Sequence, residues 1–247
     1  IYQVKRYFDQ LDRTSFELTQ FYENGDTNVV GTYINNQPNG IFKTYIPGNK
    51  LVINRCFENG IAHGVSYEYD EVTGELTVEA LYINGKMVLF GKYFPTLDTL
   101  NSVSYYYPYY TKTDTAFDFF GSLAWDKNGK IVQKMMTYFH VDAPSRIKYG
   151  ESCDVSITFQ IGMHDDCFFD LTLGEIDEDF NFTDSTQLKF FKSEGKFLKF
   201  STTDYTEGVN LLLGKIRLYD SNGEQTTLIE DPSINEYIFY HQFEVVK

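Results

Sequence analysis

The chain has 247 residues, a formal net charge of −14 and an aromatic content of 17%. This length allows one large domain or two ordinary ones, with a sizeable hydrophobic core. The excess of acidic residues makes nucleic acid and anionic lipid headgroups poor partners, because both attract clustered Lys and Arg. No segment approaches the roughly 20 consecutive apolar residues of a membrane-spanning helix. Alternating aromatic and polar residues, separated by Gly, Asn and Asp, predict an all-β protein.

Residues 15–22 form the first predicted strand, because apolar and polar side chains alternate along them. Asp12 and Arg13 precede this segment and are expected to form its turn. We interpret the strand as part of an incomplete copy of the repeat that follows.

A repeat with a period in the low twenties comes next. The segment from Tyr33 to Gly40 aligns without a gap on the segment from Phe57 to Gly64, and a third copy opens at Tyr82. The Asn-Gly pairs supply the positive φ angles that a tight hairpin turn requires. Self-similarity at this period is typical of repeated supersecondary units. We therefore expect successive β-hairpins in one antiparallel sheet, with the three leading aromatic residues on one face and the two glycines beside them.

The repeat resembles the MORN-variant family over roughly residues 20–94. It has that family's order of leading aromatic residue, Asn-Gly turn, glycine, second aromatic residue and closing glycine turn. The third copy departs from this order, because Leu89 occupies the glycine position and Gly91 follows two residues later. In bacteria such repeats are often labelled antitoxin-like, and in other organisms they are linked to membrane lipids. The second aromatic residues are Tyr45, Tyr69 and Phe94, and the closing glycines are Gly25, Gly48 and Gly74.

A tyrosine run follows the repeats and is the most unusual local composition in the chain. A tyrosine ring offers a flat apolar face and a polar tip, which suits contacts with sugars or proteins. Pro108 disfavours an inner strand here, so we expect an edge or loop position with at least two exposed rings. The alternative is that the rings cover the junction between the two parts of the chain. The candidate binding residues are Tyr105, Tyr106, Tyr107, Tyr109 and Tyr110.

Two further strands, residues 117–125 and 130–139, flank a hairpin turn at residues 126–129 and are expected to extend the repeat sheet. From Val141 the pattern resembles the short strands of an immunoglobulin-like β-sandwich, without the Cys…Trp…Cys signature of antibody domains. The expected domains are residues 1–140, the repeat sheet with its extension, and residues 141–247, the sandwich. The expected sandwich strands are residues 147–151, 155–161, 167–173, 188–191, 196–202, 211–219, 225–230 and 237–246.

Three cysteines, Cys56, Cys153 and Cys167, are present without a Cys-x-x-Cys pair. Cys153 and Cys167 each follow the apolar alternation of their own strand, which places both in the core. A tight turn is expected to join these two strands, with the cysteines at opposite ends of one hairpin. We therefore predict buried free thiols rather than a disulfide.

The sequence contains no nucleophile elbow, no His-Glu-x-x-His pair and no phosphate-binding glycine loop. His63 takes the repeat position of Asn39 and is expected to be a turn residue, and His241 a partly buried strand residue. The acidic segment from Glu175 to Asp184 has the ligand type of a calcium site. A solvated loop is the simpler interpretation, because turns favour Asp and Asn. We predict no enzyme activity, no metal site and no cofactor.

The resemblances imply an exported or lipid-anchored protein of the bacterial cell envelope or cell surface, with a leader removed or trimmed ahead of Ile1. The predicted function is non-catalytic binding or scaffolding, with a protein or carbohydrate as partner. One alternative is a carbohydrate-binding accessory protein that uses the tyrosine run. Another is an antitoxin-like protein-binding module, which would act in the cytoplasm.

Overall fold

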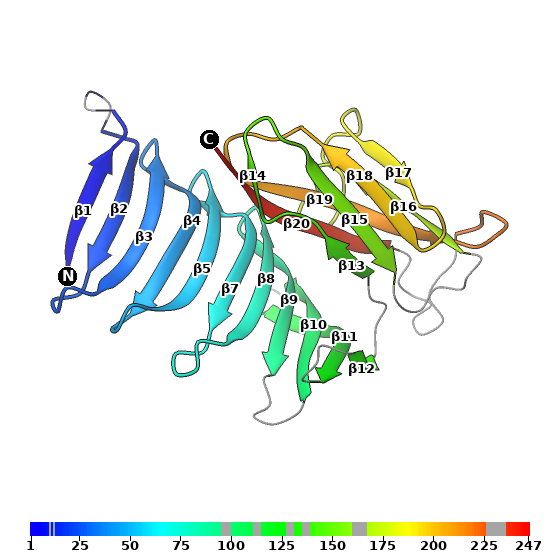
Figure 1. Ribbon diagram of the computed structural model, residues 1–247, viewed down its shortest axis with the longest axis horizontal. Coiled ribbons are helices and arrows are strands. Elements are labelled where there is room, and N and C mark those ends of the chain that lie inside the picture. The colour runs from blue at the N-terminus through cyan, green and yellow to red at the C-terminus, as the bar shows by residue number, and fades with distance from the viewer. Residues whose placement is uncertain are drawn as a thin grey trace. The chain divides into compact units, whose positions relative to one another are not determined.

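The computed structural model describes residues 1–9, 11, 13–94, 100–110, 115–126, 131–134, 139–159, 167–225 and 236–247. Every element in these ranges is a β-strand, so the predicted all-β class is confirmed (Figure 1). Within the same ranges there is no helix long and apolar enough to cross a membrane. The chain divides into two compact units, Ile1–Gln133 and Lys134–Lys247. This division lies ahead of the boundary expected after residue 140, because strand β13 (Phe139–Asp142) belongs to the second unit.

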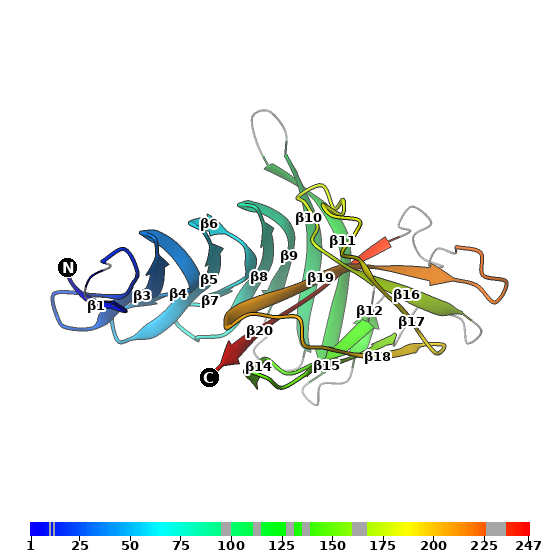
Figure 2. The ribbon, with the colours of Figure 1, turned by 90° about the horizontal axis from the view of Figure 1, so that it is seen from above.

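The first unit is a single sheet in which neighbouring strands pair antiparallel from β1 to β11. Its strands lie in chain order, except that the two-residue β6 pairs with β5 beside β7. Figure 2 shows strands from β3 to β9 curving in the same direction. The strands are β1 (Tyr2–Tyr7), β2 (Phe16–Phe21), β3 (Thr27–Ile34), β4 (Gln37–Ile46), β5 (Lys50–Glu58), β6 (Ile61–Ala62), β7 (Gly64–Tyr69), β8 (Leu76–Ile83), β9 (Lys86–Phe94), β10 (Leu100–Tyr110), β11 (Thr115–Asp126) and β12 (Ile131–Lys134).

Three hairpin turns of this sheet have positive φ at both central residues, which is the pattern of a type I′ turn. They are Asn35-Asn36 (φ 50° and 61°), Asn59-Gly60 (48° and 84°) and Asn84-Gly85 (49° and 83°). Since Asn and Gly tolerate this backbone region best, their placement explains why the chain turns here. The hairpin turns predicted from the two Asn-Gly pairs are confirmed, and Asn35-Asn36 forms the equivalent turn of the first copy.

Hydrogen bonds connect each of these turns to the preceding copy of the pattern. The N–H of Asn36 donates to the carbonyl of Thr14 (2.7 Å), and the N–H of Gly60 donates to that of Pro38 (2.8 Å). The N–H of Gly85 donates to the carbonyl of Ala62 (2.8 Å) in the same way. The bonds satisfy backbone groups that the tight turns leave unpaired, and they align successive hairpins.

The second unit consists of two sheets around a shared hydrophobic core. Phe159 of the three-stranded sheet lies 4.7 Å, between ring centroids, from Phe169 of the five-stranded sheet, and Phe191 lies 4.6 Å from Phe200. Strand order is β13-β15-β18 in one sheet and β14-β20-β19-β16-β17 in the other, where β14 and β20 are parallel. The further strands are β14 (Arg146–Lys148), β15 (Cys153–Phe159), β16 (Phe168–Leu173), β17 (Lys189–Lys192), β18 (Phe197–Thr202), β19 (Gly208–Tyr219) and β20 (Glu236–Val246).

All three cysteines are buried and free, as predicted. The expected hairpin between Cys153 and Cys167 is wrong, because β15 and β16 belong to different sheets. The apolar alternation of each strand is the same in a hairpin and in a sandwich, so it does not determine which strands pair. The predicted strand over residues 225–230 lies mostly outside the described residues, where only Gln225 is placed, in a bridge to Tyr219.

Candidate functional site

One face of the first unit carries a continuous aromatic row, which we define as Tyr7, Phe16, Tyr33, Phe42 and Phe57. Ring centroids are separated by 5.6, 4.9, 5.5 and 5.2 Å along this order. Each member comes from a different strand from β1 to β5. Cross-strand aromatic pairs of this kind stabilise a sheet by roughly 0.2–1 kcal/mol each relative to alanine. The row therefore supplies packing to a sheet that consists of a single layer of strands.

Glycines lie beside several of these rings. Gly40 pairs in register with Phe57, and Gly64 pairs with Tyr82, the leading aromatic residue of the next copy. The ring of Phe42 lies so close to Gly31 that a Cβ built on this glycine would overlap it. The predicted position of Gly40 and Gly64 beside the leading aromatic residues is confirmed, and Tyr33 and Phe57 share one face of the sheet.

Three cations lie over the aromatic side chains of this face. Lys5 Nζ is 4.4 Å from the ring centroid of Phe16, and the Arg13 guanidinium is 5.7 Å from that of Tyr7. The Arg55 guanidinium lies 5.4 Å from the ring centroid of Tyr82. Such cation–π contacts contribute about 0.5–1 kcal/mol at exposed positions. They place positive charge along one face of a chain that is strongly acidic overall.

Arg55 has a defined position on this face. Its guanidinium lies 3.5 Å from the carboxylate of Glu68, and its Nε donates to the Ser66 hydroxyl at 3.4 Å. About a third of its side chain is exposed (33%). An arginine that is held by three partners and is still open to solvent can donate further N–H hydrogen bonds to a carboxylate or carbonyl group.

The rings of the aromatic row differ in exposure. Phe16 is buried, whereas Tyr33, Phe42 and Phe57 are partly exposed. Phe16 and Tyr33 are stacked with an angle of 11° between their planes, and Phe42 contacts both Tyr33 and Phe57 in T-shaped geometry. Stacking covers one face each of Phe16 and Tyr33, and each T-shaped contact sets the edge of one ring against the face of the other, so the rings restrict access to one another's faces.

On the opposite face of the sheet, several apolar side chains of β7, β8 and β10 are buried. Val65, Leu81 and Val103 are almost completely buried there. The hydroxyl of Tyr93 donates to the carboxylate of Glu79 at 3.1 Å. Burial raises the pKa of the Cys56 thiol to about 11, so this cysteine stays protonated and poorly nucleophilic at neutral pH. This part of the sheet reads as core rather than as a reactive site.

The tyrosine run lies on β10, a strand between β9 and β11 in the sheet order. An edge or loop position was expected, because Pro108 cannot donate a ladder hydrogen bond. Pairing of β10 with β9 runs from Ser102 to Tyr106, so Pro108 lies beyond it and pairs in register with Phe117 of β11. The side chains of Tyr105, Tyr106, Tyr107, Tyr109 and Tyr110 lie outside the described residues, and their predicted exposure stays a prediction.

The register around Tyr105 differs from that of its neighbours. Tyr105 pairs with Gly91 of β9 and with Gly121 of β11, so it stands between two residues without side chains. A register shift follows between Tyr105 and Tyr106. Gly91 is the glycine that departs from the position expected in the third repeat. It pairs with an aromatic residue of the next strand, as Gly40 and Gly64 do.

A polar cluster lies on the outer face of the five-stranded sheet, around Glu236. Lys215 Nζ lies 2.7 Å from one carboxylate oxygen of Glu236, and Arg217 Nε donates to the other at 2.6 Å. Burial opposes ionisation of Glu236, but the hydrogen bonds and charges of Lys215 and Arg217 outweigh it and lower the pKa of this carboxyl group. The cluster is internally paired and leaves Glu236 little capacity for a ligand.

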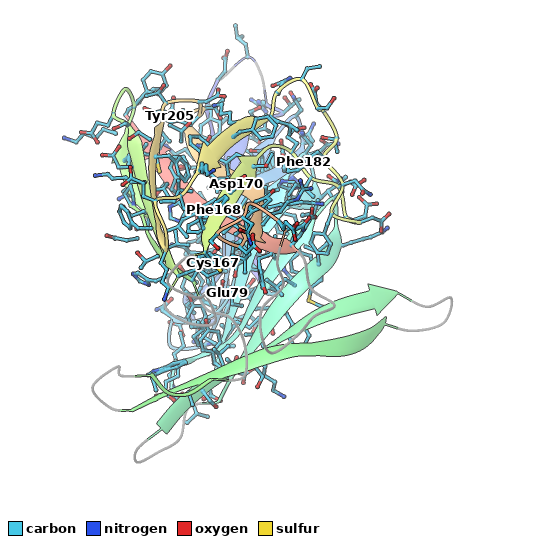
Figure 3. The ribbon with its side chains drawn as sticks, turned by 90° about the vertical axis from the view of Figure 1, so that its right-hand side faces the viewer. Glu79, Cys167, Phe168, Asp170, Phe182 and Tyr205 are labelled. Atoms are coloured by element: carbon cyan, nitrogen blue, oxygen red, sulfur yellow. The ribbon has the colours of Figure 1, made fainter. Side chains whose placement is uncertain are left out.

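Asp170 lies on β16, two residues after Phe168 (Figure 3), and is in register with Arg217 of this cluster. In register it stands between Lys192 and Arg217, but its buried Oδ1 has no hydrogen-bond partner among the described residues. Lys192 instead lies over the ring of Phe168, 4.0 Å from the centroid. Burial raises the pKa of the Asp170 carboxyl group, and the two nearby cations reduce that effect.

His63 and His241 have structural partners. The N–H of His63 donates to the carbonyl of Cys56 (3.1 Å), and its Nδ1 lies 3.5 Å from the N–H of Asn84 in the next turn. His241 is partly buried on β20, with Nε2 2.9 Å from the carbonyl of Pro144. The turn predicted for His63 is wrong, because this residue lies between strands β6 and β7 and its backbone N–H pairs with β5. The half-buried strand position predicted for His241 is confirmed.

In the acidic loop from Glu175 to Asp184, carboxylate groups accept hydrogen bonds from backbone N–H groups of the same loop. Asp177 Oδ1 accepts hydrogen bonds from the N–H groups of Asp179 (3.0 Å) and Asn181 (2.8 Å). No group of three or more His, Cys, Asp or Glu side chains in the described part of the chain is arranged to hold a metal ion. Local hydrogen bonds of this kind are typical of Asx turns.

Sequence reasoning identified Tyr33 and Phe57 but missed Phe42 and Arg55, which complete the same face. The available signal was strand alternation, since Phe42 is two residues after Gly40 and Arg55 is two residues before Phe57.

No family model, no curated protein and no solved structure matches this chain.

Proposed function

We propose that this chain is a non-catalytic binding or scaffold protein whose aromatic row holds an extended polypeptide. The observation that carries this proposal is the geometry of Tyr33, Phe42 and Phe57, three partly exposed rings in contact across neighbouring strands. Aromatic residues and arginine are the residue types most enriched at protein interfaces. Arg55 at the end of the row provides a charged anchor for an acidic or carbonyl group of the partner.

A polypeptide fits this surface better than a sugar. A sugar ring would stack on the face of an aromatic side chain, but the stacked and T-shaped contacts within the row restrict access to those faces. Ring edges and the narrow apolar surface between them suit the side chains of an extended peptide instead. The three cations of this face favour a peptide with acidic residues, because unlike charges attract and steer association.

As part of the same proposal, the protein acts in the bacterial cell envelope or at the cell surface. The hairpin turns at Asn35, Asn59 and Asn84 support a likeness to MORN-variant repeats, and the order of the two sheets in the second unit supports a likeness to an immunoglobulin-like sandwich. In such a protein the sandwich serves as a spacer or adhesion module and the repeat sheet carries the binding face. An antitoxin-like role would use the same face for a toxin in the cytoplasm.

A carbohydrate-binding role for the tyrosine run is the second candidate. The observation that favours it is the register of Tyr105 between Gly91 and Gly121. Glycines on both neighbouring strands leave room beside this position of the sheet, and sugars bind on aromatic side chains.

The test is a selection of random displayed peptides on the immobilised protein, run beside a panel of immobilised polysaccharides. The test variant is Tyr33→Leu with Phe42→Leu, which keeps apolar side chains and removes the rings. Lys43→Ala is the matched control, because Lys43 is exposed on β4 and points to the opposite face from Phe42.

The proposal predicts peptides rich in apolar and acidic residues that bind the wild type and the Lys43 control equally. The double variant should bind them at least tenfold more weakly while its thermal unfolding stays cooperative. Recovery of no peptides, or equal binding by the double variant, contradicts the proposal. Binding of a polysaccharide that is unaffected by the double variant favours the tyrosine run instead.

A further inference from the structure

The aromatic row crosses the strands of the first unit instead of following one of them. Tyr33, Phe42 and Phe57 come from β3, β4 and β5, which are consecutive strands of the sheet (Figure 1). Each of these three strands pairs with a strand on both of its sides. A partner on the row therefore lies across the strands and contacts side chains, because the strand backbones are used in the ladder.

This arrangement constrains the backbone of an extended partner. A peptide that gains no main-chain hydrogen bonds from the sheet must keep its own N–H and C=O groups in water. A polyproline II helix meets this condition, because it has no internal hydrogen bonds and its backbone is fully solvated. Proline also lacks the N–H group, so fewer donors lose water when such a segment packs on apolar rings.

The spacing of the row matches the same conformation. Tyr33 and Phe57 occupy equivalent positions of the repeat and lie two strands apart in the sheet order. Two strand spacings are about 9.4–9.8 Å. Residues i and i+3 of a polyproline II helix point the same way and are about 9.3 Å apart. Residues on one side of a β-strand recur every 6.8 Å or so, which does not keep step with the strands beneath.

Ring orientation has the same period as the spacing. The plane of Phe42 lies at 77° to that of Tyr33 and at 73° to that of Phe57. The ring that differs in orientation therefore lies between the two equivalent rings, and all three are partly exposed. A partner with a three-residue repeat can make like contacts with Tyr33 and Phe57.

Arg55 adds a requirement for charge. It pairs in register with Phe42, and a third of its side chain is exposed (33%) beside its contacts with Tyr82 and Glu68. In a polyproline II segment the two residues between i and i+3 point to the sides, so one of them lies toward Arg55. A carboxylate at that position can accept charge-assisted hydrogen bonds from the guanidinium group.

On the basis of the proposed function, we propose that the row recognises a proline-rich acidic segment of a partner protein. Two prolines three residues apart pack on Tyr33 and Phe57, and an acidic residue between them pairs with Arg55. Aromatic surfaces that bind such segments are a recurring mode of peptide recognition. The preference for acid belongs to this face, because the net charge of −14 alone would favour a basic peptide.

Fluorescence anisotropy of the full chain with three labelled peptides tests the proposal. Each peptide has four repeats, of Pro-Pro-Glu, Pro-Pro-Lys or Gly-Gly-Glu. The second reverses the charge, and the third keeps the charge but lacks the preformed helix. The wild type should bind the Pro-Pro-Glu peptide at least about tenfold more tightly than either of the others. Equal or tighter binding of either control peptide overturns the proposal.

Two variants separate the ring contact from the charge contact. Phe57→Leu should weaken binding of the Pro-Pro-Glu peptide about tenfold. Arg55→Gln should weaken it by a similar factor and leave binding of a Pro-Pro-Gln peptide unchanged. Lys43→Ala, on the opposite face, is the matched control and should bind like the wild type. Unchanged binding of the Pro-Pro-Glu peptide by either test variant, each checked for cooperative thermal unfolding, overturns the proposal.

The displayed-peptide selection separates this proposal from the proposed function. Selected peptides with prolines at i and i+3 support both. Selected peptides that lack such prolines, or that bind as amphipathic helices, overturn the proline-rich partner and leave the binding role of the row intact if Tyr33→Leu with Phe42→Leu weakens them. If neither displayed nor synthetic peptides bind, both proposals are wrong.

Discussion

At the scale of single residues, Gly31 illustrates how the aromatic row is packed. Its hydrogen atoms face the ring of Phe42, where a side chain would overlap. We predict that Gly31→Ala lowers the free energy of unfolding by about 1–3 kcal/mol, the usual cost of overpacking. The measurement is denaturant unfolding of Gly31→Ala, Phe42→Leu and the double variant. Since a smaller side chain at residue 42 relieves the overlap, the two effects should not add; additive effects would contradict the packing described.

His241 makes stability depend on pH. Burial lowers its pKa from 6.5, and the hydrogen bond to Pro144 offsets part of that effect. The unfolded chain therefore takes up a proton at a higher pH than the folded chain, and the stability associated with neutral His241 is lost as pH falls below 6.5. His241→Gln does not titrate and should lose less stability between pH 7.5 and 5. Parallel pH profiles for the two proteins, measured by urea unfolding, would show that His241 does not contribute.

At the scale of elements, the hairpin turns were the most predictable part of the fold. Asn and Gly tolerate positive φ better than other residues, so the residue types of Asn59-Gly60 and Asn84-Gly85 locate these turns from the sequence alone. Phe42 could not be placed in the same way, because its position depends on strand register and on the space above Gly31. The inner position of β10 was not predicted, because Pro108 was expected to prevent pairing with a strand on each side. Pairing with β9 ends at Tyr106, so the missing N–H of Pro108 does not interrupt it.

The turn glycines provide a direct test at this scale. Gly60 has a φ of 84°, and its N–H donates to the carbonyl of Pro38 in the preceding hairpin. Gly60→Ala should lower the free energy of unfolding by about 1–3 kcal/mol, because a Cβ disfavours this backbone region. Val72→Ala, at a highly exposed position of another turn, should change stability by no more than about 0.5 kcal/mol. A Gly60→Ala variant as stable as this control would refute the turn assignment.

At the scale of the whole molecule, the second unit has its own core. The ring of Phe139 on β13 lies 5.4 Å from that of Phe159, so the N-terminal part of this unit contributes to packing. We predict that a fragment of residues 134–247 folds cooperatively by circular dichroism and thermal unfolding. A fragment of residues 141–247 lacks Phe139 and should unfold at a lower temperature. An unfolded 134–247 fragment would show that the second unit depends on the first.

The proposed function rests on one face of the first unit, and hydrogen exchange of a peptide complex locates binding directly. The measurement compares amide exchange of the free protein with that of its complex with a selected peptide. We predict slower exchange in residues 27–58, which contain β3, β4 and β5 and therefore Tyr33, Phe42 and Phe57. Slower exchange confined to residues 100–126, the strands β10 and β11, would contradict a binding role for the aromatic row.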